Sequence, residues 1–477
     1  MFKAGSPETS GFWQGVQGDG VALPSPHEVF MKAIGLDIGT TTVSAVVLDE
    51  NGGLLEARNI PNGADVAPGV QDAEILCEKA LALAAELKQK YRPDCIGIDG
   101  QMHGVLYVDA QGRAVSPLYT WQNPMGDAPA GASGETFAQR LARLSGHHAA
   151  TGFGGTTHYA LTQRGELPAG AAKFCTIHDY IGMRLTGREA PLCHVSDAAS
   201  FGLFDVDAAR FDSAAIRAAG LDEKYFPAVT DRPEALGRDA DGLPVLCAIG
   251  DSQAAFFGSV SGQGAAAVNM GTGGQINMQG NAAGENFEKR PLGCGEYILA
   301  GASLCGGRAY ALLEGFLRSC VALAGAECAP GSLYGAMNAL AEKALDFPDK
   351  PAFSPLFCGT RRHPEKRAAL EKIDDRNFDA AHLCGAFVEG MAGELCAVYE
   401  EMRAAGAAKP ALLVGSGNAI RKNPALKAAF ERAFGMPMKI PAHQEEAAFG
   451  AALFALAGAQ DKPIWELAAK CVRYTDD

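Results

Sequence analysis

The stretch at residues 33–48 reads AIGLDIGTTTVSAVVL and sets the expectation for the whole fold. An apolar run leads to Asp37, a turn of glycine and threonine follows, and a β-branched run then resumes, which predicts a β-hairpin with a small-residue tip. Gly39 has no Cβ, so the N–H groups of the tip and the hydroxyls of Thr40 and Thr41 can approach a polyphosphate. Asp37 is placed to hold a hydrated Mg²⁺ through water. An ordinary hairpin with a threonine-rich turn is the alternative.

A second stretch, AAAVNMGTGGQINM at residues 265–278, repeats this design in the other half of the chain. Asn269-Met270-Gly271-Thr272 matches Asp37-Ile38-Gly39-Thr40 in outline, and the glycine-rich turn continues through Gly273 and Gly274. Two hairpins of one design predict a duplicated domain that holds a phosphate between its copies.

Length and composition exclude several classes of protein. A chain of 477 residues is expected to form at least two domains, and 48% hydrophobic residues with a mean hydropathy near zero indicate a water-soluble protein. The net charge of −14 argues against nucleic-acid or anionic-membrane partners. The 13 cysteines form no CxxC pair, which favours reduced core thiols in the cytoplasm over disulfides or zinc ligands. No apolar run is long enough to span a membrane.

The first thirty residues differ from the rest of the chain. Residues 1–30 are rich in Gly, Pro and Ser, lack periodicity and contain no signal-peptide core, while Met31 stands immediately before the first predicted strand. We interpret residues 1–30 as a disordered extension, and a start placed upstream of the natural one would explain it.

Regular elements can be expected along the remaining chain. Periodicity predicts a helix over residues 70–90, a buried strand over 95–99, a helix over 176–185 ended by Gly187, and a strand over 243–249. Residues 151–156 read as a loop, since no helical pattern opens directly behind them. A strand over 411–414, a helix over 424–434 and a strand over 438–440 follow. Two helices with Gly and Ala on their faces, near 254–258 and 446–452, can approach closely.

Polar loops follow the first buried strand, where ligands usually bind in α/β sheets. Gln101 and His103 of the loop GQMHG bring donors and acceptors to this position, although a lone histidine is more often structural. Trp121 stands beside two amides, which suits the CH face and hydroxyls of a sugar, and it can equally be a core residue. His178 and Asp179 look like half of a triad, but no serine in an elbow context accompanies them.

Asp251 follows the buried strand at 243–249 and precedes a helix of small residues. A carboxylate there can act as a general base, and it can equally cap the helix. In the second half, Gly415-Ser416-Gly417-Asn418 forms a strand-to-helix turn on which a flat ring or a ribose can rest. This turn lacks the GxGxxG pattern of a dinucleotide-binding fold.

Ten motifs between Ile34 and Ala457 occur in an order that resembles one family. They are DIGTTT, GQMHG, TWQN, HDYIGMRLTG, SDAASFGLFD, GDSQAAFFG, NMGTGG, LCGAFVEGMA, VGSGNAIRKN and EEAAFGAAL. Together they resemble the FGGY family of carbohydrate kinases, within the actin–hexokinase–Hsp70 superfold. GQMHG, TGFGGTT at 151–157 and TIHDY at 176–180 are most similar to the sedoheptulokinases, although xylulokinase-like members share QMHG. GSGN at 415–418 departs from the family's common GGGA, which leaves the nucleotide contacts open.

The resemblance implies an α/β fold of two ribonuclease-H-like domains, residues 31–255 and 256–477, with the active site in the cleft between them. It implies ATP and Mg²⁺ as cofactors, a small ketose as substrate and phosphorylation of a primary hydroxyl, with sedoheptulose ahead of five-carbon ketoses. Asp251 would be the catalytic base, and a homodimer is compatible with the family. The other implied site residues are Gln101, Met102, His103, Trp121 and Asp179 for the sugar; Asp37, Gly39, Thr40, Thr41, Gly271, Thr272 and Gly273 for phosphates; Asp37 for Mg²⁺; and Gly415, Ser416, Asn418 and Asn423 for adenosine.

Two other readings compete with ketose phosphorylation. The first is a nucleotide-switching ATPase of the same superfold, but GQMHG and TWQN favour a sugar pocket that such a protein does not need. The second is a sugar-binding protein without catalysis, against which the presence of Asp251 argues.

Overall fold

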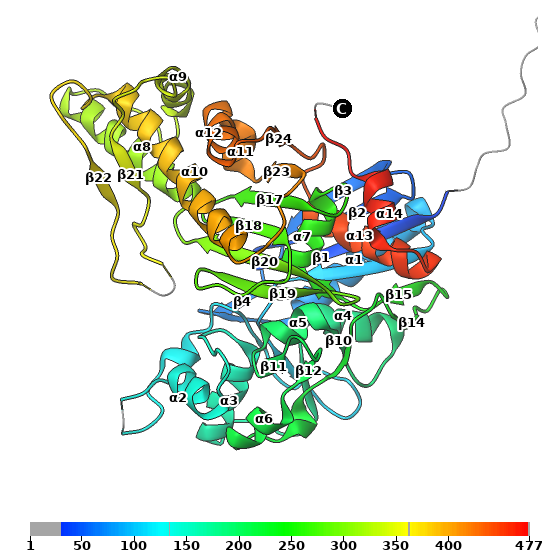
Figure 1. Cartoon of the computed structure of the whole chain (residues 1–477). Coiled ribbons are helices and arrows are strands. Elements are labelled where there is room, and N and C mark those ends of the chain that lie inside the picture. The colour runs from blue at the N-terminus through cyan, green and yellow to red at the C-terminus, as the bar shows by residue number, and fades with distance from the viewer. Residues whose placement is uncertain (1–29, 133, 361–362, 476–477) are drawn as a thin grey trace, which may run out of the picture. The chain divides into compact units, whose positions relative to one another are not determined.

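The computed structural model describes residues 30–132, 134–360 and 363–475 (Figure 1). The predicted extension lies outside the described residues except for Phe30. The contacts of the chain group Met31–Asp477 into one unit. The predicted domain boundary at 255/256 falls inside helix α7, Asp251–Ser259, and stays a prediction.

Strands of the first half form a seven-stranded sheet around the predicted hairpin. Its order is β14-β15-β6-β1-β2-β3, with β16 pairing with β6 off this path. The bounds are Ala235–Arg238 for β14, Pro244–Leu246 for β15, Cys95–Gly100 for β6, Lys32–Ile38 for β1, Thr42–Asp49 for β2, Leu54–Pro61 for β3 and Ile249–Gly250 for β16. The strand expected over 243–249 is thus two short strands, both parallel to β6.

Strands of the second half form a six-stranded sheet in the order β19-β20-β18-β17-β23-β24. The bounds are Phe287–Gly293, Glu296–Ser303, Gly274–Gln279, Ala265–Met270, Leu412–Ser416 and Met438–Lys439, in that order. In both sheets an antiparallel hairpin, β1–β2 or β17–β18, carries a parallel strand on one side, β6 or β23, and an antiparallel strand on the other, β3 or β20. Both predicted hairpins are therefore confirmed, and their surroundings repeat as well.

In the described part of the chain, five smaller sheets occur outside the two large ones, four in the first half of the chain and one, β21-β22, in the second. They are β4-β5-β8 (Asp65–Ala67, Val70–Gln71, Leu118–Tyr119), β7-β9 (Leu106–Val108, Lys173–Cys175), β10-β13 (Leu192–His194, Ala228–Thr230), β11-β12 (Phe204–Asp205, Arg210–Phe211) and β21-β22 (Ala352–Ser354, Ala369–Glu371).

Helices cover these sheets, and 3₁₀ turns occur at Pro124–Asp127 and Glu223–Tyr225. Those of the first half are α1 Ala73–Tyr91, α2 Phe137–Ser145, α3 Gly154–Arg164, α4 Ile177–Thr186, α5 Val195–Ser200, α6 Ser213–Ala218 and α7. Those of the second half are α8 Gly307–Leu323, α9 Tyr334–Ala344, α10 Ala380–Ala404, α11 Asn418–Lys422, α12 Pro424–Phe434, α13 Glu446–Gln460 and α14 Ile464–Cys471. Among the described residues, none of the helices has the length and apolar character that a membrane span requires.

Two helix expectations need correction. The helix expected from residue 70 begins at Ala73, because the Asp72 side chain caps it by accepting the N–H groups of Glu74 and Ile75. The stretch 151–156, expected to be a loop, contains the start of α3 at Gly154. Tertiary packing outweighs the poor helix propensity here, since a Cβ on Gly154 would lie 2.5 Å from the Val105 side chain.

Helix α13 comes from the second half of the sequence but packs against the first sheet, where Figure 1 shows it in red beside the blue strands. Two glycines of the sheet make this approach possible: a Cβ on Gly35 would lie 1.9 Å from the Ala448 carbonyl oxygen, and one on Gly97 would lie 2.0 Å from that of Ala451. Helices α13 and α7 also meet backbone to backbone, with a Cβ on Gly450 coming within 1.8 Å of the Ala254 oxygen. The expected close approach of these two helices is confirmed.

Candidate active site

Three carboxylates gather at one edge of the first sheet. Asp37 lies near the end of β1 in register with Asp99 on β6, and Asp251 follows β16, which pairs with the end of β6. Because these strands are parallel, their carboxyl ends bring the three side chains to the same edge. Gly250 is the N-cap of α7 and Asp251 is its first residue, so the alternative in which Asp251 is the helix cap does not hold.

Burial and mutual repulsion make these acids hard to ionise. Burial raises the pKa of Asp99 well above its ordinary value, and the charges of Asp37 and Asp251 add to this. Burial also raises the pKa of Asp37, and the charge of Asp251 adds to it. Asp251 has a pKa raised to about 6, first by burial and then by the charge of Asp197. Sequence reasoning missed Asp99 as a site residue, although an acid that ends an apolar strand was a visible signal.

Side-chain amides hold the tip of the first hairpin. The carboxamide nitrogens of Asn62 and Gln71 each donate to the Thr40 carbonyl oxygen at 2.7 Å. Gln101 donates from Nε2 to Gln71 Oε1 at 2.9 Å, and the Trp121 indole N–H donates to Thr40 Oγ1 at 3.0 Å. The structure therefore brings Gln101 and Trp121 to the hairpin tip, where Thr40 joins the two predicted sugar loops.

A cavity of about 160 Å³ lies next to the carboxylates and is lined from both halves of the chain. Met102 and His103 line it on one side, and Glu288, Lys289 and Arg290 of β19 line it on the other. The His103 ring stacks on Phe153 at 4.6 Å between centroids and lies 2.8 Å from the Ser200 carbonyl oxygen through Nδ1. Because a carbonyl only accepts, Nδ1 carries the proton and donates it.

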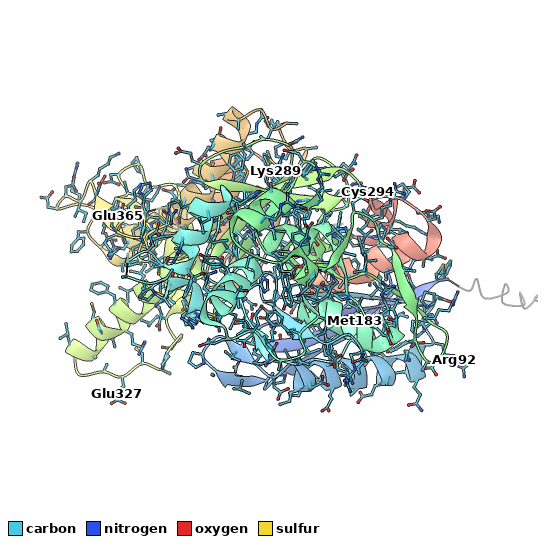
Figure 2. All side chains as sticks on the ribbon, turned by 90° about the horizontal axis from the view of Figure 1, so that it is seen from below. Arg92, Met183, Lys289, Cys294, Glu327 and Glu365 are labelled. Atoms are coloured by element: carbon cyan, nitrogen blue, oxygen red, sulfur yellow. The ribbon has the colours of Figure 1, made fainter. Side chains whose placement is uncertain are left out.

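Cations at this cavity have acidic partners. Arg290 pairs with Glu288 at 2.7 Å, Lys289 with Asp207 at 2.5 Å, and His147 with Asp212 at 3.0 Å. Lys289, labelled in Figure 2, marks the course of β19 past the cavity. Sequence reasoning missed the contribution of β19, because nothing in the local pattern places that strand against GQMHG.

Asp179 is not brought to the cavity. It is buried, and it caps α4 reciprocally with Thr176: the Asp179 N–H donates to Thr176 Oγ1 at 3.0 Å, and the Thr176 N–H donates to the Asp179 carboxylate at 3.3 Å. Its role in sugar binding stays a prediction.

A second cavity, of about 670 Å³, lies beside the second hairpin. The predicted residues Gly271, Thr272, Asn418 and Asn423 line it, together with the stacked aromatic pair Tyr310 and Tyr334, which sequence reasoning missed.

Other predicted residues support this cavity from outside its lining. A Cβ on Gly415 would lie 2.3 Å from the Met438 sulfur, and Ser416 Oγ accepts from the Asn269 amide at 3.0 Å. A Cβ on Gly273 would lie 2.9 Å from the Ser303 oxygen. These glycines allow close backbone packing under the cavity. Gly39 and Thr41 belong to the tip of the first hairpin.

The lining of the larger cavity fits a nucleotide. A Cβ on Gly271 would meet nothing within 4 Å, which leaves room at the hairpin for phosphates, and the tyrosine pair offers a flat surface to a base. Within the described residues, no group of three or more His, Cys, Asp or Glu side chains could hold a metal ion. The single carboxylate of Asp37 fits a Mg²⁺ ion that keeps most of its water shell, and it would hold such an ion through water.

Comparison with protein families decides the class of this site. Residues 32–258 match the N-terminal domain of the FGGY family of carbohydrate kinases, and residues 266–459 match its C-terminal domain. The chain belongs to this family. In this carbohydrate kinase the first matched region ends within α7, and the second begins within β17.

Individual relatives of the kinase are more distant. Sedoheptulokinase of Mus musculus is 27% identical over 480 residues, which cover 89% of this chain and 97% of the relative. Xylulose kinase of Streptomyces rubiginosus is 26% identical over 264 residues, which cover 51% of this chain and 53% of the relative. Among solved structures, xylulose kinase from Rhodospirillum rubrum superposes with a TM-score of 0.79 at 20% identity, covering 93% of both chains. The predicted fold class, α/β with two ribonuclease-H-like domains of the actin–hexokinase type, is confirmed.

Proposed function

We propose that this kinase transfers the γ-phosphoryl group of ATP to a primary hydroxyl of a neutral ketose, with Asp251 as general base. What supports the proposal is that the residues on either side of Asp251 contact the smaller cavity and the second hairpin. Met102 of the smaller cavity touches the preceding residue, since a Cβ on Gly250 would lie 2.9 Å from its sulfur. The following residue, Ser252, accepts from Gln275 of the second hairpin at 3.0 Å and lies 3.4 Å from the Arg290 guanidinium.

Asp251 has the properties that proton abstraction requires. Its pKa of about 6 leaves it mostly ionised at neutral pH while keeping it basic enough to accept a hydroxyl proton. Thr40 and the second hairpin line the path of the phosphates, and Asp37 would hold Mg²⁺ through water. Bound Mg²⁺ would neutralise charge on the phosphate oxygens.

The charge of the smaller cavity favours a neutral substrate. Arg290 and Lys289 each have a carboxylate partner, so these two cations are compensated and offer little attraction to an acidic sugar. This supports a ketose as substrate over gluconate, an acidic sugar that appears in the name of one relative, the gluconokinase of Bacillus subtilis.

As the substrate, we favour a seven-carbon ketose over a five-carbon one. The relatives named sedoheptulokinase, from Mus musculus and Homo sapiens, align over 89% of this chain, whereas the relative named xylulose kinase aligns over 51%. A pentulose kinase is the second candidate, and the likeness to solved xylulose kinases favours it at the level of fold alone.

Phosphate transfer measured over a panel of sedoheptulose, D-xylulose, D-ribulose and gluconate tests the proposal. We expect the highest kcat/KM for sedoheptulose, a lower value for the pentuloses and none for gluconate. A preference for D-xylulose would transfer the assignment to the second candidate. ATP hydrolysis that no sugar accelerates would overturn sugar phosphorylation and favour a nucleotide-switching ATPase.

We also propose a cytoplasmic location, supported by cysteines that are all free thiols and mostly buried. A homodimer stays a prediction, which sedimentation at micromolar concentration would test.

A further inference from the structure

A buried chain of polar groups lies behind Asp251. The Gly250 N–H donates to Ser196 Oγ at 3.0 Å, and the Ser196 hydroxyl is 3.3 Å from Asp197 Oδ2. The other oxygen of Asp197 lies 3.2 Å from His178 Nε2. Ser196 is 1% exposed, and His178 and Asp197 are fully buried. The chain therefore links the strand-to-helix turn that carries Asp251 to an imidazole in the interior.

Local structure fixes both ends of this chain. His178 stands in the first turn of α4, which the Thr176 side chain caps. Its ring lies under the end of β6, because a Cβ on Gly100 would come within 2.7 Å of His178 Nδ1. At the other end, α5 packs against β16 and holds the Gly250 amide through Ser196. Neither group can turn away without displacing backbone.

The charges around His178 are almost all negative. It faces Asp197 from α5, Asp179 from its own helix and Asp251 from α7, and its own charge also acts on Asp37 of β1. Burial lowers the pKa of His178, but these carboxylates outweigh burial and raise it overall. His178 is thus a buried imidazole beside the acidic edge, and the surrounding carboxylates favour its protonated form.

The groups that act on Asp251 fall into two sets. Burial and the charges of Asp197 and Asp37 hinder its ionisation, while His178, the Ser252 N–H and Arg290 on the cavity wall favour it. Near Ser196, His194 Nδ1 lies 2.9 Å from the same hydroxyl, and the pKa of that histidine is lowered to about 3 by burial, so it stays neutral. Asp197 and His178, which are paired with each other, therefore act on the pKa of Asp251 in opposite directions.

We propose that Ser196, Asp197 and His178 are positioning residues for Asp251: Ser196 holds the Gly250 amide that precedes it, and Asp197 ties Ser196 to His178 in the interior. This inference rests on the proposed role of Asp251 as the general base. Ser196 fixes the backbone, and Asp197 joins it to His178, whose pKa this carboxylate raises. Of the three, Ser196 lines the smaller cavity, and Asp197 and His178 lie behind it.

The pH profile of kcat/KM for the best ketose tests the charge. In His178→Gln the lost cation makes Asp251 harder to ionise, so the acid limb should move up by about one pH unit. In the double variant His178→Gln with Asp197→Asn, the hindering anion is removed as well, and the limb should return toward that of the parent. Such a rescue is the signature of a coupled pair.

His158→Gln is the matched control. His158 is also buried, at 1% exposure, but it bonds to the Tyr107 hydroxyl at 2.8 Å and faces no carboxylate cluster. It should lower the Tm and leave the acid limb in place. An unmoved acid limb in His178→Gln, with a Tm loss like that of the control, would overturn the inference.

Ser196→Ala tests positioning without a change of charge and with little risk to folding. We expect kcat to fall about tenfold through misplacement of Asp251, with the acid limb unmoved. A parent-like kcat would overturn the positioning role. Asp251→Asn measured beside these variants separates the two proposals: if it stays active, the general-base proposal fails, whereas if it is inactive and the other variants are silent, only the positioning network fails.

Discussion

The two hairpins share one sequence design but are supported in different ways. Side-chain amides of Asn62 and Gln71 hold the carbonyls of the first tip. Main-chain groups at the start of α8 hold the second: the Gly307 N–H donates to the Gly271 oxygen at 2.8 Å and the Arg308 N–H to the Thr272 oxygen at 3.1 Å.

The charge of the two hairpins differs as well. Asp37 stands before the first tip, beside Asp99, whereas the matching position of the second hairpin is Asn269, which bonds to Ser416. The same local fold thus serves an acidic edge held by side chains in the first hairpin and a neutral edge held by the backbone in the second. Local sequence determines the hairpin, and the elements packed against it determine its chemistry.

Among these variants Asp251→Asn should lower the activity most, because it removes the proposed base from the acidic edge of the first half. An asparagine keeps the size of the side chain and cannot accept a proton at neutral pH. We expect kcat to fall by about 10²–10⁴ with an unchanged Tm and unchanged nucleotide binding. Nearly parental activity would show that the carboxylate is not the base.

Asp37→Asn makes the first hairpin resemble the second. We expect a loss of about 10–100-fold in activity at limiting Mg²⁺, recovered in part at high Mg²⁺. The Tm should not fall, since an asparagine still offers a hydrogen-bond partner to the Asp99 carboxyl. The reciprocal variant Asn269→Asp is the control and should weaken ATP binding without this Mg²⁺ dependence. If the activity of Asp37→Asn depended on Mg²⁺ concentration in the same way as that of the parent, Asp37 would not be a Mg²⁺-holding residue.

Gly271→Ala tests the neutral edge. The added methyl group meets no protein atom within 4 Å, so stability should be unchanged. It lies in the larger cavity, the proposed nucleotide site, and should raise the KM for ATP about tenfold. Gly306→Ala is the control, because its Cβ would lie 2.4 Å from the backbone of Gly273 and should lower the Tm. An unchanged KM in Gly271→Ala would place the phosphates elsewhere.

The acidic edge should also make stability depend on pH. The pKa of Asp99 is raised in the folded state, so the folded protein binds its proton more tightly than the unfolded chain does. Its contribution to stability is therefore present at low pH and lost as the pH rises through the folded-state pKa. Without Mg²⁺, Asp99→Asn should reduce the fall in Tm between about pH 5 and pH 7.5 by about 2–4 °C. If the Tm of Asp99→Asn and of the parent fell equally over this pH range, the pKa of Asp99 would not be raised in the folded state.

Trp121→Phe should give the smallest effect. It keeps an aromatic ring and removes only the indole donor to Thr40, at a site where the side chain is 46% exposed. We expect a loss of about threefold in kcat/KM for the ketose and no change in Tm. Trp465→Phe is the matched control: its indole bonds to Glu296 at 2.7 Å, outside both cavities of the site, and should leave kinetics unchanged.

The elements that could be predicted from the sequence are those that a local pattern of residues determines. Both hairpins and α12, Pro424–Phe434, follow from turn residues and periodicity. Non-local packing determined the rest: α3 forms because its glycines fit against Val105 and Phe201, and β19 reaches the sugar side only through the second sheet. Asp99, Arg290 and the tyrosine pair were missed for the same reason, since each gains its setting from a distant part of the chain.

The packing of α13 on the first sheet has a consequence for biosynthesis. During translation β1 and β2 emerge early, but the helix that covers this face of the sheet, Glu446–Gln460, emerges some four hundred residues later. Until then the backbone grooves at Gly35 and Gly97 and the apolar strands around them stay open. A nascent chain that exposes such a surface is prone to aggregate, so the first half of this kinase is expected to need its own C-terminal region, or a chaperone in its place, to remain soluble.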